Sequence, residues 1–141
     1  MSDKVIELAP TEAFNILKKN PNAVLIDIRS SQEFLFVGHP KGAVSVPWID
    51  EPDWIVDPHF TANVRRVMLG GTNDEGEANP PMCILICRSG RRSHEAGERL
   101  LSSGLRNIYH ISGGFEGPLN DDHQRSRIAG WRFEGLPWEQ C

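Results

Sequence analysis

One seven-residue segment of the sequence carries the residue types that thiolate chemistry requires. It runs from Cys87 to Ser93 and reads Cys-Arg-Ser-Gly-Arg-Arg-Ser. It follows the apolar run Met82 to Ile86 and precedes a helical pattern. The backbone N–H groups of a strand-to-helix loop, the helix N-terminus and three arginines all favour an anion over a neutral thiol. The segment therefore predicts a nucleophilic cysteine in a cup that attracts a small anion.

The elements that position this loop alternate between strands and helices along the chain. Strands are predicted at residues 4–8, 23–28, 43–46, 82–86 and 107–111. Helices are predicted at 10–19, 60–69 and 93–101, with a cap and one or two helical turns at 30–36. This order predicts an α/β fold with an open, mainly parallel five-stranded sheet and helices on both faces. Ligands of such sheets bind beyond the carboxyl ends of the strands, where Cys87 falls.

The composition narrows the class of protein. We expect one domain over residues 1–141, with a core at about 4–117 and a tail, 118–141, whose aromatic residues pack back on it. The hydrophobic content of 39% and charged content of 24% are typical of globular proteins. A net charge of −4 argues against nucleic-acid binding. The N-terminus lacks a signal-peptide core and no segment reaches transmembrane length, so no membrane association is predicted.

The cysteines favour a reducing compartment over a disulfide framework. There are three, without a repeating spacing. Cys83 and Cys87 on one extended strand are separated by roughly 13 Å, which no disulfide spans. A cytoplasmic location is therefore expected, with Cys83 as an inert core residue. Zinc binding by Cys83, Cys87 and His94 is not predicted, because the spacing matches no common ligand pattern. Cys141 is either a relay thiol or a chance terminal residue.

Three separated motifs carry a resemblance to a known family. They are Leu25-Ile26-Asp27-Ile28-Arg29 with Glu33-Phe34, then Gly38-His39 with Gly42-Ala43 and Val46-Pro47, and finally the loop Cys87 to Ser93 with Gly113-Gly114-Phe115. Together they resemble the rhodanese family of sulfurtransferases from about Val24 to Gly117. The sequence departs from the family pattern at Pro40-Lys41, in the insert Trp48 to Pro81 and in the tail from Pro118. The two longer departures leave the choice of substrate open.

The resemblance implies a reaction in two halves. Cys87 attacks the terminal sulfur of a small anionic donor such as thiosulfate, sulfite leaves, and a Cys87 persulfide remains. A thiol, a dithiol protein or cyanide then accepts the sulfur, and neither a metal nor an organic cofactor is required. A persulfide carrier that takes sulfur from a partner protein in a relay is the alternative that the sequence leaves open.

The remaining loop residues, including Arg92, are expected to form the substrate-binding loop. Arg88 aligns with a family position that helps to bind the anionic donor. Gly90 allows the backbone to approach an anion closely. Ser89 and Ser93 offer hydroxyls to the sulfur or to the helix start. Arg91 is at the rim, where substrate contact and solvation are equally expected.

Four residues outside the loop, together with Arg92, are expected to support it. Arg92 is expected to turn inward and brace a carboxylate, either Glu33 or Asp27. For Asp27, Arg29 and Glu33 a structural ion-pair role is favoured over a catalytic one. His39, in a tight turn, is expected to serve packing or hydrogen bonding, because an existing thiolate needs no base.

Two functions of other classes compete with sulfur transfer. Tyrosine phosphatases and arsenate reductases use a related loop with five residues between cysteine and arginine, whereas here four residues separate Cys87 from Arg92. A shorter loop makes a smaller cup, which suits a sulfur atom better than a tetrahedral oxyanion. A non-catalytic binding module is the second rival, and the presence of Cys87 with its arginines argues against it.

Overall fold

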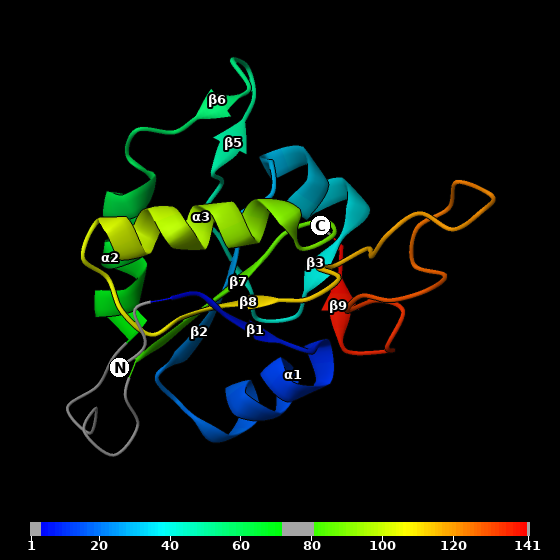
Figure 1. The fold of residues 1–141 in the computed structure, drawn as a ribbon, viewed down its shortest axis with the longest axis horizontal. Coiled ribbons are helices and arrows are strands. Elements are labelled where there is room, and N and C mark those ends of the chain that lie inside the picture. The colour runs from blue at the N-terminus through cyan, green and yellow to red at the C-terminus, as the bar shows by residue number, and fades with distance from the viewer. Residues whose placement is uncertain (1–3, 72–80, 141) are drawn as a thin grey trace.

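A parallel five-stranded sheet forms the centre of the protein (Figure 1). The computed structural model describes residues 4–71 and 81–140. The strand order is β1-β8-β7-β2-β4, and every neighbouring pair is parallel. The strands are β1 (Ile6–Leu8), β2 (Ala23–Asp27), β4 (Val44–Ser45), β7 (Met82–Ile86) and β8 (Ile108–Ile111). The predicted α/β class is confirmed, with the apolar strands β2 and β7 paired near the centre of the sheet.

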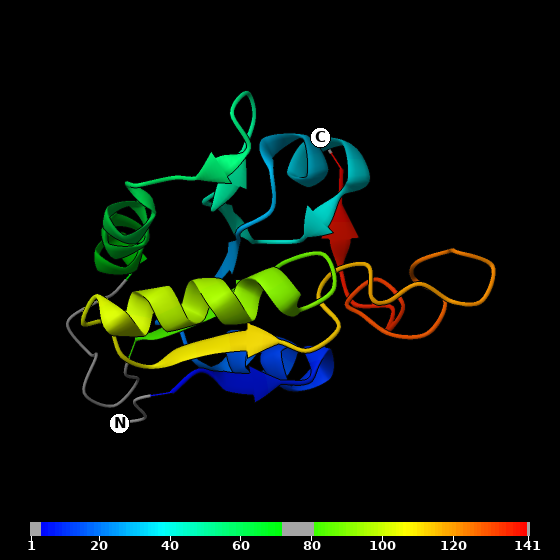
Figure 2. The same ribbon diagram turned by 45° about the horizontal axis from the view of Figure 1, so that its top comes forward.

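Helices cover both faces of this sheet (Figures 1 and 2). Helix α1 (Pro10–Lys19) lies on one face, where Ala13 packs with Leu25 and Ile84. Helices α2 (Phe60–Gly71) and α3 (Arg91–Ser102) lie on the other. There Val64 and Leu100 pack in a cluster with the β-strand residues Ile26, Cys83 and Leu85. The two clusters match the alternation of side chains along β2 and β7.

Two small antiparallel sheets were not predicted from the sequence. Strand β3 (His39–Pro40) pairs with β9 (Trp138–Glu139), and β5 (Ile49–Asp50) pairs with β6 (Ile55–Val56). The first pair joins residues about a hundred positions apart, and two-residue strands carry no periodicity that a sequence pattern could reveal.

The tail after residue 117 has buried and projecting parts. Trp131 is 1% exposed, and its ring meets that of Phe14 edge-on at 5.9 Å between centroids. Its indole N–H donates to the carbonyl of Pro137 at 2.8 Å. The orange segment near residue 120 extends away from the body in both views (Figures 1 and 2). Trp131 therefore anchors the end of the chain on the α1 face of the sheet.

Three predicted boundaries need correction. Helix α3 begins at Arg91, two residues before the predicted start, because Gly90 adopts a left-handed φ of 102° that ends the loop there. Helix α2 continues to Gly71, so the loop predicted at 70–80 begins as helix, and its residues 72–80 lie outside the described part. The turns predicted at 30–36 include a π-helical turn, η1 (Glu33–Val37), closed by a bond from Gly38 N–H to the Glu33 carbonyl.

None of the helices in residues 4–71 and 81–140 combines the length and the apolar character needed to cross a membrane.

Candidate active site

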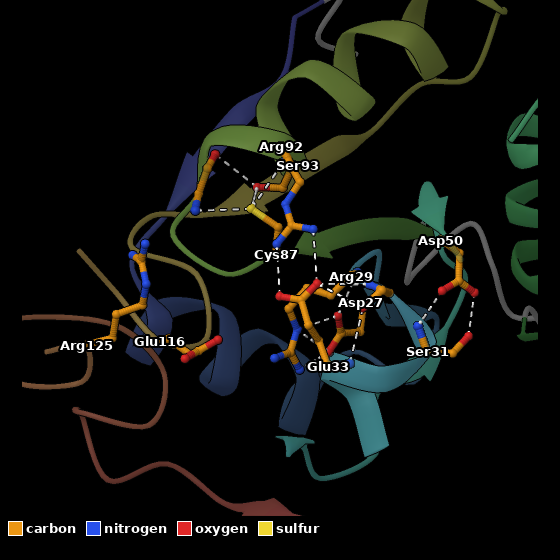
Figure 3. Close-up of polar contacts among 12 residues, drawn as sticks. Asp27, Arg29, Ser31, Glu33, Asp50, Cys87, Arg92, Ser93, Glu116 and Arg125 are labelled. Atoms are coloured by element: carbon orange, nitrogen blue, oxygen red, sulfur yellow. Dashed lines mark hydrogen bonds and ion pairs between the residues drawn. The ribbon is translucent and has the colours of Figure 1, made fainter. Parts of the chain in front are cut away.

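Cys87 lies directly after β7, at the carboxyl end of the sheet, and its sulfur is surrounded by hydrogen-bond donors (Figure 3). The Sγ accepts from the N–H of Gly90 at 3.1 Å and from the N–H of Ser93 at 3.3 Å. The Ser93 hydroxyl oxygen lies 3.4 Å from the same sulfur. Cys87 is 1% exposed. Two fixed backbone donors at a buried sulfur form a cup that stabilises negative charge there.

A second loop holds the cysteine loop in this shape. The carbonyls of Cys87 and Arg88 accept from the N–H groups of Phe115 and Glu116 at 2.8 and 2.9 Å. Because these carbonyls bond to the second loop, the nearby N–H groups are left to face the sulfur. Gly114 makes the close approach possible, since a Cβ there would lie 2.6 Å from the Arg88 carbonyl carbon. This contact explains the glycine at position 114.

Arg92 joins the cysteine loop to the segment after β2. Its guanidinium donates to both carboxylate oxygens of Glu33, each at 3.2 Å, so Glu33 is its partner of the two expected (Figure 3). Burial alone would raise the pKa of Glu33, but hydrogen bonds and charge from Arg92 outweigh it and lower that pKa. Ser30 donates from its N–H and hydroxyl to the same carboxylate, both at 3.2 Å. The pair therefore fixes the first turn of α3 to the start of η1.

Arg92→Ala is expected to lower the free energy of unfolding by about 1–2 kcal/mol at pH 7, because a partly buried, two-bonded ion pair is lost. Folding lowers the pKa of Glu33 from its ordinary value of 4.5. The stabilisation that the ionised Glu33 gives to the fold is therefore complete above pH 4.5 and is lost as the pH falls through the lower pKa of the folded state. Urea unfolding at pH 7 and at pH 3 measures this, with the exposed neighbour Arg91→Ala as the control. An Arg92→Ala protein as stable as the control would reverse the bracing assignment.

Asp27 and Arg29 form a second ion pair, which is fully buried. Both side chains have zero exposure, and Arg29 Nη2 lies 2.7 Å from Asp27 Oδ2. Arg29 also donates to the Gly38 carbonyl, and its guanidinium lies 4.6 Å from the centre of the Phe115 ring. The pair thus ties the end of β2 to the turn before β3 and to the loop that holds Cys87.

His39 lies apart from the sulfur. Its ring stacks on Phe34 with 3.7 Å between centroids, and its Nδ1 bonds to the Phe34 carbonyl at 2.7 Å. Its Nε2 lies 3.6 Å from Glu139 on β9. These contacts place His39 in the packing between η1, β3 and β9.

An open cleft of about 760 Å³ leads to the cysteine loop. Its lining residues come from residues 30–37, the β5–β6 hairpin, the cysteine loop, the second loop and the tail: Ser30, Gln32, Glu33, Phe36, Val37, Trp54, Arg88, Arg92, Glu116 and Arg125. Arg88 is exposed within this lining, and Ser89 is half-buried in the loop. Arg91 is exposed outside the lining. The structure thus gathers two of the three loop arginines, Arg88 and Arg92, at the cleft.

Sequence reasoning missed several residues of this cleft. Arg125 comes from the tail, where its Nη1 donates to the Gly117 carbonyl at 2.8 Å, and it lines the same cleft as Glu116. Phe36 and Trp54 are 68% and 54% exposed at the rim. None of the three belongs to a motif, and no sequence signal marks them. They are brought together by η1, the hairpin and the tail, which lie far apart in the chain.

The other described cysteine differs sharply from Cys87. Cys83 is buried in the cluster beneath α2 and α3, where desolvation raises the pKa of its thiol to about 12. A thiol in that environment stays protonated and unreactive at neutral pH. Cys141 lies outside the described residues.

One family model matches most of the chain, and several known proteins are similar to it over nearly their whole length. The model of the Rhodanese-like domain matches residues 10–120. The uncharacterized protein RC0915 of Rickettsia conorii is 30% identical, with 96% of this chain and 98% of that protein covered. The thiosulfate sulfurtransferase GlpE of Actinobacillus pleuropneumoniae is 27% identical over 99% of this chain and 97% of its own. The crystal structure of Rv0390 from M. tuberculosis has 33% identity and a TM-score of 0.80, covering 98% of this chain and 99% of that one.

Proposed function

Because this chain belongs to the rhodanese-like domain family, we propose that it is a sulfurtransferase with Cys87 as its nucleophile. The observation that carries the proposal is the position of the Cys87 sulfur, 3.1 and 3.3 Å from two backbone N–H groups. A cup of this kind stabilises the attacking thiolate and equally the anionic persulfide that replaces it. The likeness to a thiosulfate sulfurtransferase over nearly the whole chain supports the same reaction.

The proposed reaction begins with attack on a thiosulfate-like donor. The Cys87 thiolate forms a bond to the terminal sulfur, the bond between the two donor sulfurs breaks, and its electron pair leaves with sulfite. An acceptor thiolate then attacks the terminal sulfur of the Cys87 persulfide, and Cys87 regains its thiolate. Low-molecular-weight thiols, a dithiol protein and cyanide are the acceptors that fit this second step, and no cofactor or metal takes part.

The charge at the cleft supports an anionic donor. Arg88 and Arg125 reach the lining from separate segments in a chain of net charge −4. Such a local cluster of guanidinium groups suits a small dianion with several oxygens. Because the net charge of the chain is −4, we do not propose nucleic acid as a partner. A persulfide carried by a partner protein is the alternative donor, and the open shape of the cleft is compatible with it.

Arg88→Ala is expected to raise the KM for thiosulfate about tenfold with a smaller change in kcat, because one charge-assisted contact of about 1–3 kcal/mol is lost on donor binding. Steady-state sulfur transfer from thiosulfate to cyanide measures both constants. Arg127→Ala, an exposed tail arginine outside the cleft lining, is the matched control. If both variants have the KM of the parent, Arg88 does not bind the donor.

The arginine geometry argues against the phosphatase alternative. An arginine that stabilises a phosphoryl oxyanion must point its guanidinium into the cup. Here Arg92 instead gives two hydrogen bonds to Glu33. Assaying the same preparation for aryl-phosphate hydrolysis and for thiosulfate sulfurtransfer tests the proposed function, which requires sulfur transfer and no appreciable phosphatase turnover. Phosphatase turnover that depends on Cys87, without sulfur transfer, would overturn it.

The cysteine chemistry supports a reducing location. Cys83 and Cys87 are both free thiols. A reactive thiol that must stay reduced between turnovers fits the cytoplasm better than an oxidising compartment. We therefore propose a cytoplasmic site of action.

A further inference from the structure

Ser93 links the Cys87 sulfur to a buried histidine. The Ser93 hydroxyl oxygen lies 3.4 Å from Cys87 Sγ and 3.1 Å from His110 Nδ1. Cys87, Ser93 and His110 are 1%, 0% and 4% exposed, so all three residues are buried. A hydroxyl that both donates and accepts is the group able to pass a proton between a thiol and an imidazole.

The far side of His110 leads toward solvent. Its Nε2 lies 3.7 Å from a carboxylate oxygen of Glu7 on β1, whose side chain is 65% exposed. His94 of α3 faces the same ring, with 5.4 Å between centroids, and is half exposed. From β7 the residue paired with His110 is the apolar Leu85. Glu7 and His94 are therefore the ionisable groups that face His110 from β1 and α3.

These surroundings leave His110 able to accept a proton. Burial lowers the pKa of His110, the Glu7 charge acts to raise it, the nearby His94 lowers it, and a hydrogen bond with the Gly90 backbone raises it; the net effect is a lowered pKa. A lowered pKa favours the neutral imidazole, and in the tautomer that carries its hydrogen on Nε2 the Nδ1 atom can accept a proton from Ser93. The Ser93 hydroxyl donates to the Gly90 carbonyl at 3.1 Å, so it must rotate toward His110 Nδ1 before its proton is transferred.

We propose that Cys87, Ser93 and His110 form a proton relay that takes the thiol proton from the sulfur. The Cys87 proton passes to Ser93 Oγ as the Ser93 hydroxyl proton passes to His110 Nδ1, which leaves a thiolate, an intact hydroxyl and an imidazolium. The reverse transfer restores the thiol. This positioning role of His110 rests on the proposed function of Cys87 as the nucleophile.

The relay accounts for the removal of the Cys87 thiol proton, which the backbone N–H groups around the sulfur do not explain. The two N–H groups stabilise a thiolate, but a sulfur that is 1% exposed has little direct access to water that could take its proton. The relay places the proton on His110 Nδ1, and the imidazolium can then release the proton of its other nitrogen, Nε2, which lies 3.7 Å from the exposed Glu7 carboxylate. The cleft remains free for the donor, because the proton leaves on the α3 and β1 side of the sheet.

The first test measures the rate of Cys87 alkylation by iodoacetamide from pH 5 to 9, which requires no sulfur donor. His110→Asn retains a group able to hydrogen bond to Ser93 but takes up no proton. We expect its alkylation at pH 7 to fall about tenfold, with the midpoint moved upward by about one pH unit. Ser93→Ala should have a similar effect, and the double variant should be no slower than the slower single variant, because both steps lie in one series. His123→Asn, at an exposed loop position, is the control.

A second measurement leaves the relay residues unchanged. The NMR signals of the His110 ring are followed with pH in the parent and in Cys87→Ala. In the parent they should move at the pH where alkylation of Cys87 sets in, and in Cys87→Ala that movement should be absent. A folded His110→Asn with the parental alkylation profile, or His110 signals that titrate identically in both proteins, would overturn the relay. Neither outcome bears on sulfur transfer itself. A failure of the proposed sulfur transfer would instead appear as the absence of a Cys87 persulfide after incubation with a sulfur donor.

Discussion

Cys87→Ser is expected to lower sulfur transfer at least about 10³-fold, because a serine hydroxyl is neither ionised at neutral pH nor comparably nucleophilic toward sulfur. Its free energy of unfolding should remain within about 1 kcal/mol of the parent, since the substitution exchanges one small buried atom for another that accepts the same N–H groups. The measurements are the steady-state rate with thiosulfate and cyanide and the urea midpoint of each protein.

Cys83→Ala is the matched control for this variant. Cys83 lies four residues earlier, on β7, and outside the cleft lining, with a thiol that burial keeps protonated. Its loss should cost some stability but no activity per folded molecule. The nucleophile assignment is wrong if Cys87→Ser retains a tenth of the parental rate, or if Cys83→Ala loses activity while folded.

Asp27→Asn is expected to lower the free energy of unfolding by about 3–5 kcal/mol, because it leaves the fully buried Arg29 charge without its counter-ion. The amide is nearly isosteric, so packing is retained and the loss reports the charge. The effect should extend to activity under conditions where the variant is folded, since Arg29 contacts the Phe115 ring and Phe115 bonds to the Cys87 carbonyl.

Urea unfolding compares this variant with Asp53→Asn, an exposed aspartate in the β5–β6 hairpin. The control should change stability by less than about 0.5 kcal/mol. If the free energy of unfolding falls no more in Asp27→Asn than in the control, the buried ion pair does not stabilise the fold.

Much of the fold follows from local sequence patterns. The near-continuous apolar runs of β2 and β7 identify the central strands, and Pro10 with the following pattern marks α1 from Pro10 to Lys19 as observed. A cysteine directly after β7, followed by glycine and a helix start, indicates the anion cup without any knowledge of the fold. These features depend on residues within a few positions of one another, which is why sequence alone is sufficient for them.

The remaining parts of the site depend on tertiary neighbours. Arg125 reaches the cleft from a tail without periodicity, and the β3–β9 pair closes over about a hundred residues. His110 meets Ser93 because β8 lies beside β7 and beneath α3, a juxtaposition that strand order decides. Sequence patterns specify which face of a strand is buried but not which strand is its neighbour, so such partners become visible only in the structure.

Cys87 is proposed to carry sulfur as a persulfide, and mass spectrometry of the protein after incubation with thiosulfate tests this directly. We predict an added mass of about 32 Da that a thiol reductant removes. Peptide mapping should locate it on Cys87 rather than on either of the other two cysteines. A natively folded protein that gains no sulfur on Cys87 from thiosulfate or any other sulfane donor, or that gains it on another cysteine, would contradict the account.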